Sequence, residues 1–171
     1  YEGPETMTLQ AATAVNASAV SGTGTIYDDG RTIDGNSNDD RPRVVSITDD
    51  TAAEGSPLVF TVTLSNASTT ATTVSLAQVS GTATVGTDTG AMSVSFDGGA
   101  TYTTVSGSSV SVPAGATSFL VQIATIDDSV YEGPETMTLQ AATAVNASAV
   151  SGTGTIYDDG RTIDGNSNDD R

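Results

Sequence analysis

The sequence predicts an all-β protein, an antiparallel β-sandwich of immunoglobulin-like topology with seven to eight strands. Apolar and polar residues alternate with a period of two, turn residues recur at short intervals, and no segment shows the 3.6-residue period of a helix. Small and β-branched residues dominate the composition, which is typical of thin strands with polar outer faces. With only three Phe in the chain, we expect a thin core.

A long exact repeat organises the chain. Residues 1–41 are identical to residues 131–171, an offset of 131 − 1 = 130 residues. Such complete identity indicates recent tandem duplication, with a cloning duplication as the alternative. We therefore expect the last two strands of a preceding repeat at 1–29, an acidic inter-repeat linker at 30–43, a complete sandwich at 44–159 and the start of the next linker at 160–171.

The strands of the complete repeat follow from the alternation. Leu58, Phe60, Val62 and Leu64 alternate with polar or β-branched residues, which predicts a half-buried strand. Gly, Pro, Asn, Asp and Ser punctuate the chain between such segments. Strand-like segments lie at 44–47, 58–65, 72–79, 92–96, 101–105, 109–112, 119–123, 137–145 and 152–157.

The first 29 residues have the sequence of a hairpin without the strands that it should pair with. Met7 and Leu9 copy Met137 and Leu139. A lone hairpin is marginally stable in water, so we expect a neighbour to order this segment. The expected partners are neighbouring identical repeats in the same polypeptide, or inter-chain strand complementation in which residues 1–29 exchange with 131–159 of a second copy.

The charge and composition exclude several classes of function. The chain has 5 Lys and Arg against 21 Asp and Glu, a net charge of -16. Such a surface repels nucleic acid and anionic lipid, and no apolar run approaches the roughly 20 residues that span a bilayer. We expect no nucleic-acid partner and no membrane insertion. Without Cys or His there are no thiol or imidazole groups, whereas hard cations can still bind through oxygen.

Carboxylates are expected to converge at one end of the sandwich. Alternate turns of a seven-stranded sandwich lie at alternate ends, so the loops after the first, third, fifth and seventh strands share an end. At ~4–6 Å and an effective dielectric near 20, each unneutralised pair costs roughly 3–4 kcal/mol. We expect Ca²⁺ as the counter-ion, since it accepts about 6–8 oxygen ligands in flexible geometry, and Mg²⁺ fits less well. The acids are Glu54, Asp88, Asp127, Asp128, Glu132, Asp158 and Asp159.

The linker holds a second group of acids. Asp28 and Asp29 copy Asp158 and Asp159, so they should be the last ligands of a site whose other walls belong to the preceding domain. Asp34-x-Asn36-x-Asn38 places oxygen ligands at alternate positions, like the opening of an EF-hand loop. It departs from that motif, since Asp39 replaces the expected Gly and no Glu follows at position 12. A second calcium site and a solvated acidic linker are equal alternatives here.

Four segments carry a resemblance to a known family, namely Glu54-Gly55, Gly81-Thr82-Ala83 ahead of Asp88, Asp127-Asp128 leading into Tyr131-Glu132-Gly133-Pro134-Glu135, and Gly154 to Asp159. Together they resemble the Calx-β pattern and, more narrowly, the tandem extender repeats of giant bacterial RTX adhesins. The resemblance covers nearly all of 44–159. It implies calcium ligands at the seven acids named above, bacterial origin, type I secretion and a place on the cell surface. Gly160 stands where the family often has a third acid, so one ion could be lost or completed by the linker.

The leading functional expectation is a structural extender module that Ca²⁺ stiffens at inter-domain junctions and that projects a distal binding region from the cell. The alternative is a glycan- or ice-binding module, based on Thr-rich segments such as 69–73, although Thr is an ordinary outward-facing strand residue. A carboxylate pair could hydrolyse glycosides. The acids cluster at a domain tip without another catalytic group, so we expect no enzyme.

Overall fold

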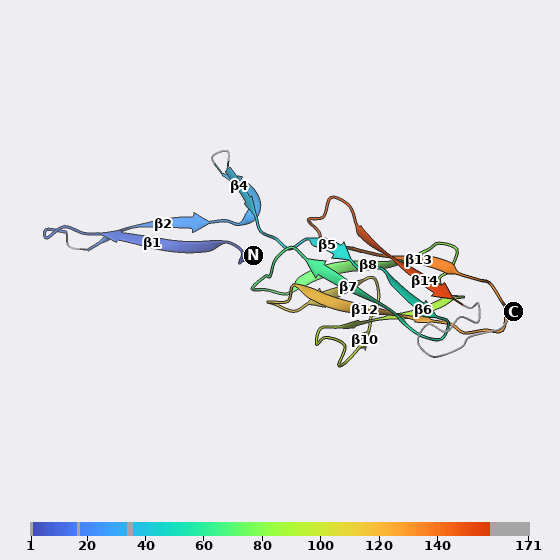
Figure 1. Ribbon diagram of the computed structural model, residues 1–171. Helices are drawn as coiled ribbons and strands as arrows, with labels where there is room; N and C mark the ends of the chain where they lie inside the picture. The colour runs from blue at the N-terminus through green and yellow to red at the C-terminus, as the bar shows by residue number, and fades with distance from the viewer. Residues whose placement is uncertain (1, 17, 34–35, 158–171) are drawn as a thin grey trace.

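The structure is a computed structural model that describes residues 2–16, 18–33 and 36–157, with only the backbone described for 29–38. Within these ranges the chain forms fourteen strands (Figure 1). Two small two-stranded sheets come first, β1 (Glu5–Ala11) with β2 (Val20–Ile26) and β3 (Asp29–Ile33) with β4 (Asn36–Asp39). The described part of the chain has no helix that could cross a membrane.

The remaining strands form a β-sandwich, which confirms the predicted fold class. Its two five-stranded sheets have the orders β10-β9-β12-β7-β5 and β11-β8-β13-β14-β6. These strands pair antiparallel except for β6 and β14, which run parallel. Their bounds are β5 Val44–Ile47, β6 Asp50–Ala53, β7 Leu58–Leu64, β8 Thr72–Ser80, β9 Thr89–Ser95, β10 Thr103–Thr104, β11 Ser109–Val112, β12 Ser118–Thr125, β13 Glu135–Ala142 and β14 Val150–Tyr157.

The core lies between the two sheets and follows the predicted alternation. Leu58, Phe60 and Val62 of β7 are each 0% exposed, while the residues between them are partly exposed. Because successive side chains of a strand point to opposite faces, this period of two directs every second residue of β7 into the core. Residues of β12, β8, β13 and β14 meet them from both sheets, namely Val121, Ile123, Val74, Met137, Leu139 and Ile156.

The first strand of the sandwich changes sheets, which the sequence did not predict. β5 pairs with β7 in one sheet, and β6 pairs with β14 in the other. Two side chains hold the crossing, since Asp49 Oδ1 accepts a 2.7 Å hydrogen bond from Thr153 N and Asp50 Oδ2 accepts a 2.6 Å bond from Val59 N. The chain therefore reaches Glu54 beside the end of β14.

The N-terminal hairpin, β1 with β2, projects away from the sandwich (Figure 1). Every residue of both strands is exposed. The closing hairpin, β13 with β14, has the same sequence and the same register, with Glu5 opposite Ile26 in one copy and Glu135 opposite Ile156 in the other. Between the N-terminal hairpin and the sandwich, β3 and β4 occupy residues that the sequence predicted only as a linker.

Candidate metal centre

Four segments meet at the end of the sandwich where β14 finishes. Glu54 N donates a 3.1 Å hydrogen bond to Tyr157 O, which joins the turn after β6 to the end of β14. Ile126 N donates to Asp88 O at 2.9 Å, and Ala83 N donates to Thr136 O at 3.0 Å. These backbone bonds bring the loops after β6, β8 and β12 to one end, together with the start of β13.

Three carboxylates form an acid cluster at this end: Asp88, Glu132 and Glu135. One oxygen of each lies within 4.8 Å of the others. Asp88 is 6% exposed, and its Oδ2 accepts a hydrogen bond from Thr84 N, which fixes the side chain in its loop. Glu132 lies in the loop before β13, and Glu135 is the first residue of that strand.

Glu54 is a fourth acid at this end of the sandwich, and it is only 4% exposed. The Oε2 atoms of Glu54 and Glu135 are buried from solvent. Gly55 follows with a φ of 75°, and a Cβ placed there would lie 3.2 Å from the Cβ of Asp127. Asp127 therefore lies against the turn that carries Glu54, and a larger residue than Gly at position 55 would crowd it.

The ten candidate ligands have different places in the structure. Asp88 and Glu132 belong to the acid cluster, and Glu54 and Asp127 lie in adjoining turns. Asp128 is exposed, and its Oδ1 accepts a 2.7 Å hydrogen bond from Val130 N in its own loop. Asp34, Asp158 and Asp159 lie outside the described residues, and only the backbone of Asp29 is described.

The candidate ligands named from the sequence did not include Glu135. Gly133 has a φ of 76°, a left-handed conformation that favours Gly, and Pro134 follows it. The chain bends at these two residues, and carboxylate oxygens of Glu132 and Glu135 lie within 4.8 Å of each other. Two acids flanking a Gly-Pro turn are the sequence signal that could have identified Glu135.

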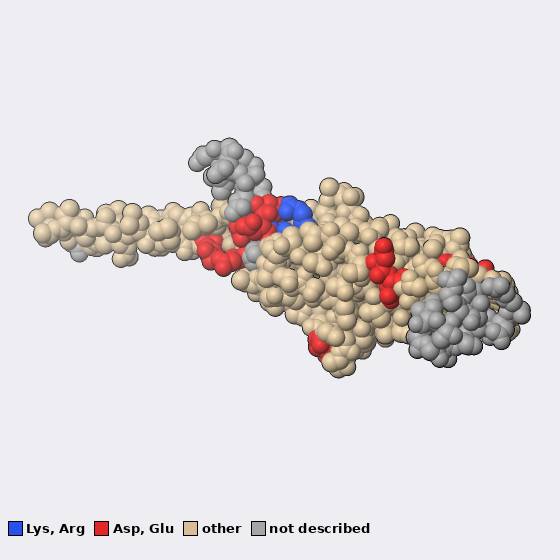
Figure 2. Space-filling model, viewed as in Figure 1, with Lys and Arg blue, Asp and Glu red and all other residues tan. Residues whose placement is uncertain are grey.

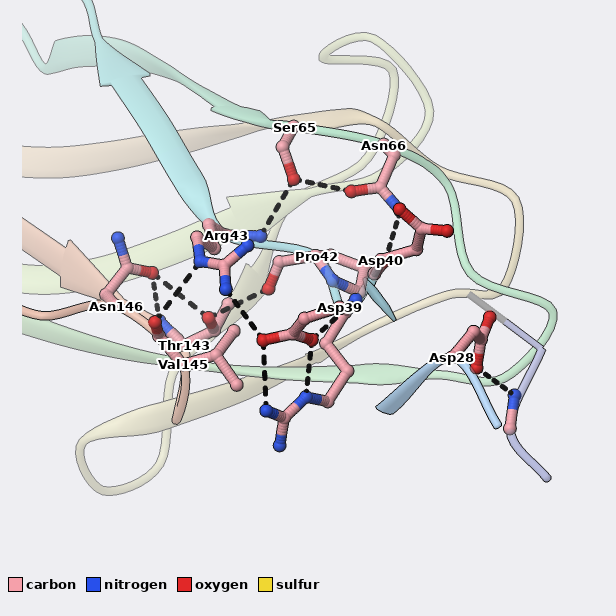
Figure 3. A network of polar contacts seen from close by, with 12 residues as sticks. Asp28, Asp39, Asp40, Pro42, Arg43, Ser65, Asn66, Thr143, Val145 and Asn146 are labelled. Carbon is pink, nitrogen blue, oxygen red and sulfur yellow. Dashed lines mark hydrogen bonds and ion pairs between the residues drawn. The ribbon is translucent and has the colours of Figure 1, made fainter. Parts of the chain in front are cut away.

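Asp28 lies at the opposite junction, between the N-terminal hairpin and the sandwich (Figure 3). Its Oδ2 accepts a 3.1 Å hydrogen bond from Glu2 N, and its Oδ1 accepts a 3.2 Å bond from Gly3 N. The backbone oxygen of Asp28 accepts a 3.1 Å bond from Asp40 N. Asp28 therefore closes the base of its hairpin and connects it to the end of β4.

Asp39 at this junction is neutralised by two arginines (Figure 3). Figure 2 shows basic residues beside acidic residues at this place, between the N-terminal hairpin and the sandwich. Its Oδ1 lies 2.8 Å from Arg41 Nε, and its Oδ2 lies 2.7 Å from a terminal nitrogen of Arg43. Hydrogen bonding to the Arg41 side chain lowers the pKa of Asp39 to about 2. Arg43 Nε also donates to Val145 O at 3.3 Å, so the network fastens the linker to the closing hairpin.

The acid cluster suits a hard cation rather than an acid–base reaction. Two oxygens that each lie ~2.4 Å from one Ca²⁺ can be up to about 4.8 Å apart, which matches the spacing of the three carboxylates. All three donors are carboxylate oxygens, two on loops and one at the start of β13, and Ca²⁺ tolerates the irregular geometry of such a set. Asp88, Glu132 and Glu135 are thus the residues that would hold the ion, with Glu54 and Asp127 in reach of the same end.

Comparison with solved structures places the fold. The structure described as the calcium binding domain CBD12 of CALX1.1 matches with a TM-score of 0.50 and 21% identity, over 67% of this chain and 46% of that chain. The complete sandwich has a Calx-β-like fold. Two further structures match over similar parts of the chain. They are the apo-form Calx CBD1 domain (TM-score 0.47, 20% identity, 68% of this chain and 98% of that one) and CBD12 from CALX1.2 (0.45, 17%, 66% and 45%).

No protein-family model matches the chain, and no curated protein matches it by sequence. The 21% identity to the CALX1.1 structure establishes the fold alone. What the Calx-β-like sandwich does must therefore be argued from its own residues, and above all from the acid cluster where β6 and β14 finish.

Proposed function

We propose that the Calx-β-like sandwich is a non-enzymatic calcium-binding module. The observation that carries this proposal is the grouping of Asp88, Glu132 and Glu135, whose oxygens lie within 4.8 Å of one another. At that distance and an effective dielectric near 20, two carboxylates repel by about 3 kcal/mol. A divalent cation turns this repulsion into attraction. The similar CALX1.1 structure is itself described as a calcium binding domain.

A bound ion would fix the direction in which the chain leaves the sandwich after β14. Tyr157, the last residue of β14, is bonded through its backbone oxygen to Glu54 N at 3.1 Å. Asp158 and Asp159 follow it directly in the sequence. An ion held by the acid cluster and Glu54 would draw these next carboxylates toward it. The exit strand would then be held in one direction rather than repelled from the sandwich end.

Our finer proposal is an extender module of a secreted bacterial surface adhesin, in which such junctions repeat along the polypeptide. Two observations support it. The 41-residue repeat reproduces the closing hairpin and the linker without a single change, as expected where copies add length. The acids lie at the end of the sandwich from which the next unit would begin. Neighbouring identical repeats are the partners that this function requires.

Calcium binding is tested by calorimetric titration and by thermal unfolding of the whole chain. Extracellular calcium sites have Kd of ~10⁻⁴–10⁻³ M. At 100 times the Kd the ion adds about 2.7 kcal/mol of stability. For a domain of this size we expect the Tm to rise by roughly 5–10 °C. The double variant Glu132→Gln and Glu135→Gln should lose most of this rise.

The repeat supplies a matched control. Glu2 and Glu5 occupy the same sequence context in the N-terminal hairpin, so the variant Glu2→Gln and Glu5→Gln removes the same two charges away from Asp88. It should keep the calcium-dependent rise in Tm. Equal losses in the two double variants would contradict the site.

The stiffening mechanism needs its own measurement. A tandem of two complete repeats should show a larger maximum dimension by small-angle X-ray scattering in calcium than in chelator. An unchanged dimension would reject stiffening even if the ion binds.

A further inference from the structure

The N-terminal hairpin presents an apolar face that the same residues bury in the closing hairpin. Met7, Leu9 and Ile26 are 57%, 70% and 57% exposed. Their copies in β13 and β14 are 1%, 0% and 1% exposed, in the same order, and pack on core residues of β5 to β8. A soluble chain rarely leaves such a row of large apolar side chains uncovered without a binding partner.

Two glycines in each hairpin show how closely a partner must approach this face. In the closing hairpin they lie against the neighbouring strands, and in the N-terminal hairpin no other strand of the described residues covers them. A Cβ at Gly152 would lie 2.6 Å from Ile47 Cγ2 and from Thr48 O, and a Cβ at Gly154 would lie 2.6 Å from Leu58 Cδ1. The copy of Gly152 is Gly22, where a Cβ would meet no described atom within 4 Å. At Gly24 a Cβ would meet only the flexible side chain of Met7, at 3.4 Å. The space that these glycines leave is used only when strands with the sequence of β5 to β7 cover them.

The loop of the hairpin carries a polar group for the same partner. Asn146 Oδ1 accepts a 3.0 Å hydrogen bond from Val44 N, and Asn146 Nδ2 donates a 2.9 Å bond to Val44 O. Both copies accept a bond from the Thr three residues earlier, at 3.0 Å from Thr143 Oγ1 for Asn146 and at 2.6 Å from Thr13 Oγ1 for Asn16, but only Asn146 also bonds to a strand of the sandwich. Three features of the hairpin therefore complement the same strands, β5 to β8. They are the row of apolar side chains, the two glycines that allow close approach, and the carboxamide of the Asn.

We propose that the exposed face of the N-terminal hairpin is an interaction surface for a second copy of this chain. In the complex, β1 and β2 of one molecule occupy the place of β13 and β14 in the sandwich of another. The register follows from the closing hairpin, where Gln140 lies opposite Ala77 of β8. Gln10 of one chain would thus lie opposite Ala77 of its partner. The proposal does not rest on metal binding, although Glu5 of one chain would take the place of Glu135 beside Asp88 of its partner.

A second copy fits this role better than the chain's own sandwich. Residues 1–171 hold one set of acceptor strands and two identical hairpins that can close it. In the closing hairpin, β14 finishes beside Glu54, whereas β5 starts at the opposite end, beside Asn146. To close its own sandwich, the N-terminal hairpin would need residues 27–43 to run back along the whole domain. That path would break the bond from Asp40 N to Asp28 O, which holds the base of the hairpin at the end of β4.

Engineered cysteines test the pairing, because the chain has none of its own. The donor is the full chain with Gln10→Cys. The acceptor is the full chain with Ala77→Cys and with four glycines of the two hairpins replaced by valine, so that neither hairpin can close the acceptor's own sandwich. The four replacements are Gly22→Val, Gly24→Val, Gly152→Val and Gly154→Val. Directly opposed residues of antiparallel strands lie at a Cα separation that a disulfide can bridge. The two chains are refolded together in chelator and then oxidised.

We expect a disulfide-linked heterodimer as the main oxidised product. A control donor, with Gln10→Cys, Gly22→Val and Gly24→Val, keeps the cysteine but fills the space that the partner needs. It should give at least tenfold less heterodimer. Absence of the heterodimer, or equal yields from the two donors, would overturn the proposal.

A second experiment avoids an acceptor that could fail to fold. A single chain with Gln10→Cys and Ala77→Cys is refolded at increasing concentration and oxidised, and its mass is measured by light scattering. The expected products are disulfide-linked dimers and larger species whose share rises with concentration. The pair Gln140→Cys and Ala77→Cys should give a monomer with an internal disulfide. A monomeric Gln10–Ala77 cross-link, or no cross-link, would reject a second copy as the partner.

Discussion

The N-terminal hairpin and the closing hairpin have the same sequence and different surroundings. Both form two antiparallel strands in one register, so these features follow from local sequence. Burial does not follow from it, since Leu9 is 70% exposed and Leu139 is 0% exposed. The comparison shows that a segment specifies its own strands and register, whereas the strands that pack on it decide whether its side chains are buried.

The acids of the two hairpins show the same separation. Glu2 and Glu5 are exposed, whereas their copies Glu132 and Glu135 lie within 4.8 Å of Asp88. The hairpin brings two carboxylates, and β8 and its loop bring the third. A candidate metal centre therefore arises only where the repeat meets the rest of its sandwich.

Truncating the same leucine in each copy should give the largest difference. Leu139→Ala removes a fully buried side chain and leaves a cavity, so we expect a loss of about 2–5 kcal/mol in the free energy of unfolding. Leu9→Ala should change it by less than about 0.5 kcal/mol, as for an exposed residue. Urea unfolding at low protein concentration measures both. Similar losses would mean that the N-terminal hairpin is buried in solution.

Adding a methyl group to the paired glycines should give the next largest effect. At Gly152 the new Cβ would press on Thr48 O, a backbone atom that cannot turn aside, so Gly152→Ala should cost about 1–3 kcal/mol. Gly22→Ala has open space and should be neutral or slightly stabilising. Thermal unfolding of the two variants checks this pair. A neutral Gly152→Ala would contradict the tight approach of β14 to β5.

Removing the paired carboxamides should have a smaller effect. Asn146→Ala leaves the backbone of Val44 without two hydrogen bonds at the edge of β5, so we expect a loss of about 1–2 kcal/mol. Asn16→Ala should cost only a few tenths of a kcal/mol, since Asn16 bonds within an exposed loop. Hydrogen exchange of the Val44 amide provides a local measurement. Unchanged protection in Asn146→Ala would show that another group holds β5.

Lowering the pH should weaken the junction between the N-terminal hairpin and the sandwich. This is the smallest of the four expected effects on stability. Hydrogen bonding to Arg41 lowers the pKa of Asp39 from 3.8 to about 2. A lowered pKa in the folded state adds stability that is fully present above pH 4 and is lost as the pH falls toward 2. Asp39 is 21% exposed, so solvent screens its ion pairs and limits the gain. NMR titration of the Asp39 carboxyl should give a midpoint near 2 that rises in Arg41→Gln, and an ordinary midpoint would contradict the ion pairs.

Much of the sandwich could be predicted from the sequence because its strands are amphipathic. The alternation around Phe60 identified β7, and the turn residues that bound each segment identified its neighbours. The crossing from β5 to β6 could not be predicted in this way. It depends on hydrogen bonds from Asp49 and Asp50 to strands that are distant in sequence, and these bonds have no local pattern.

The candidate site could be predicted in part, for a similar reason. Strand order suggested which loops share an end, and Asp88 and Glu132 do lie together there. Glu135 was missed because the turn at Gly133, rather than the strand order, brings it to Glu132. At the other junction, the sequence left a second calcium site and a solvated acidic linker as equal alternatives, and the ion pairs of Asp39 with two arginines could not be predicted from it.

The parallel pairing of β6 with β14 determines how the sandwich would carry a mechanical load. The chain enters at β5, continues into β6, and leaves from the far end of β14. A pull on the two ends therefore draws β6 and β14 past each other along their length. Their backbone hydrogen bonds, spread over Asp50–Ala53 and Gly154–Tyr157, would be loaded together in shear rather than opened one after another. The short parallel pair is thus a clamp against tension.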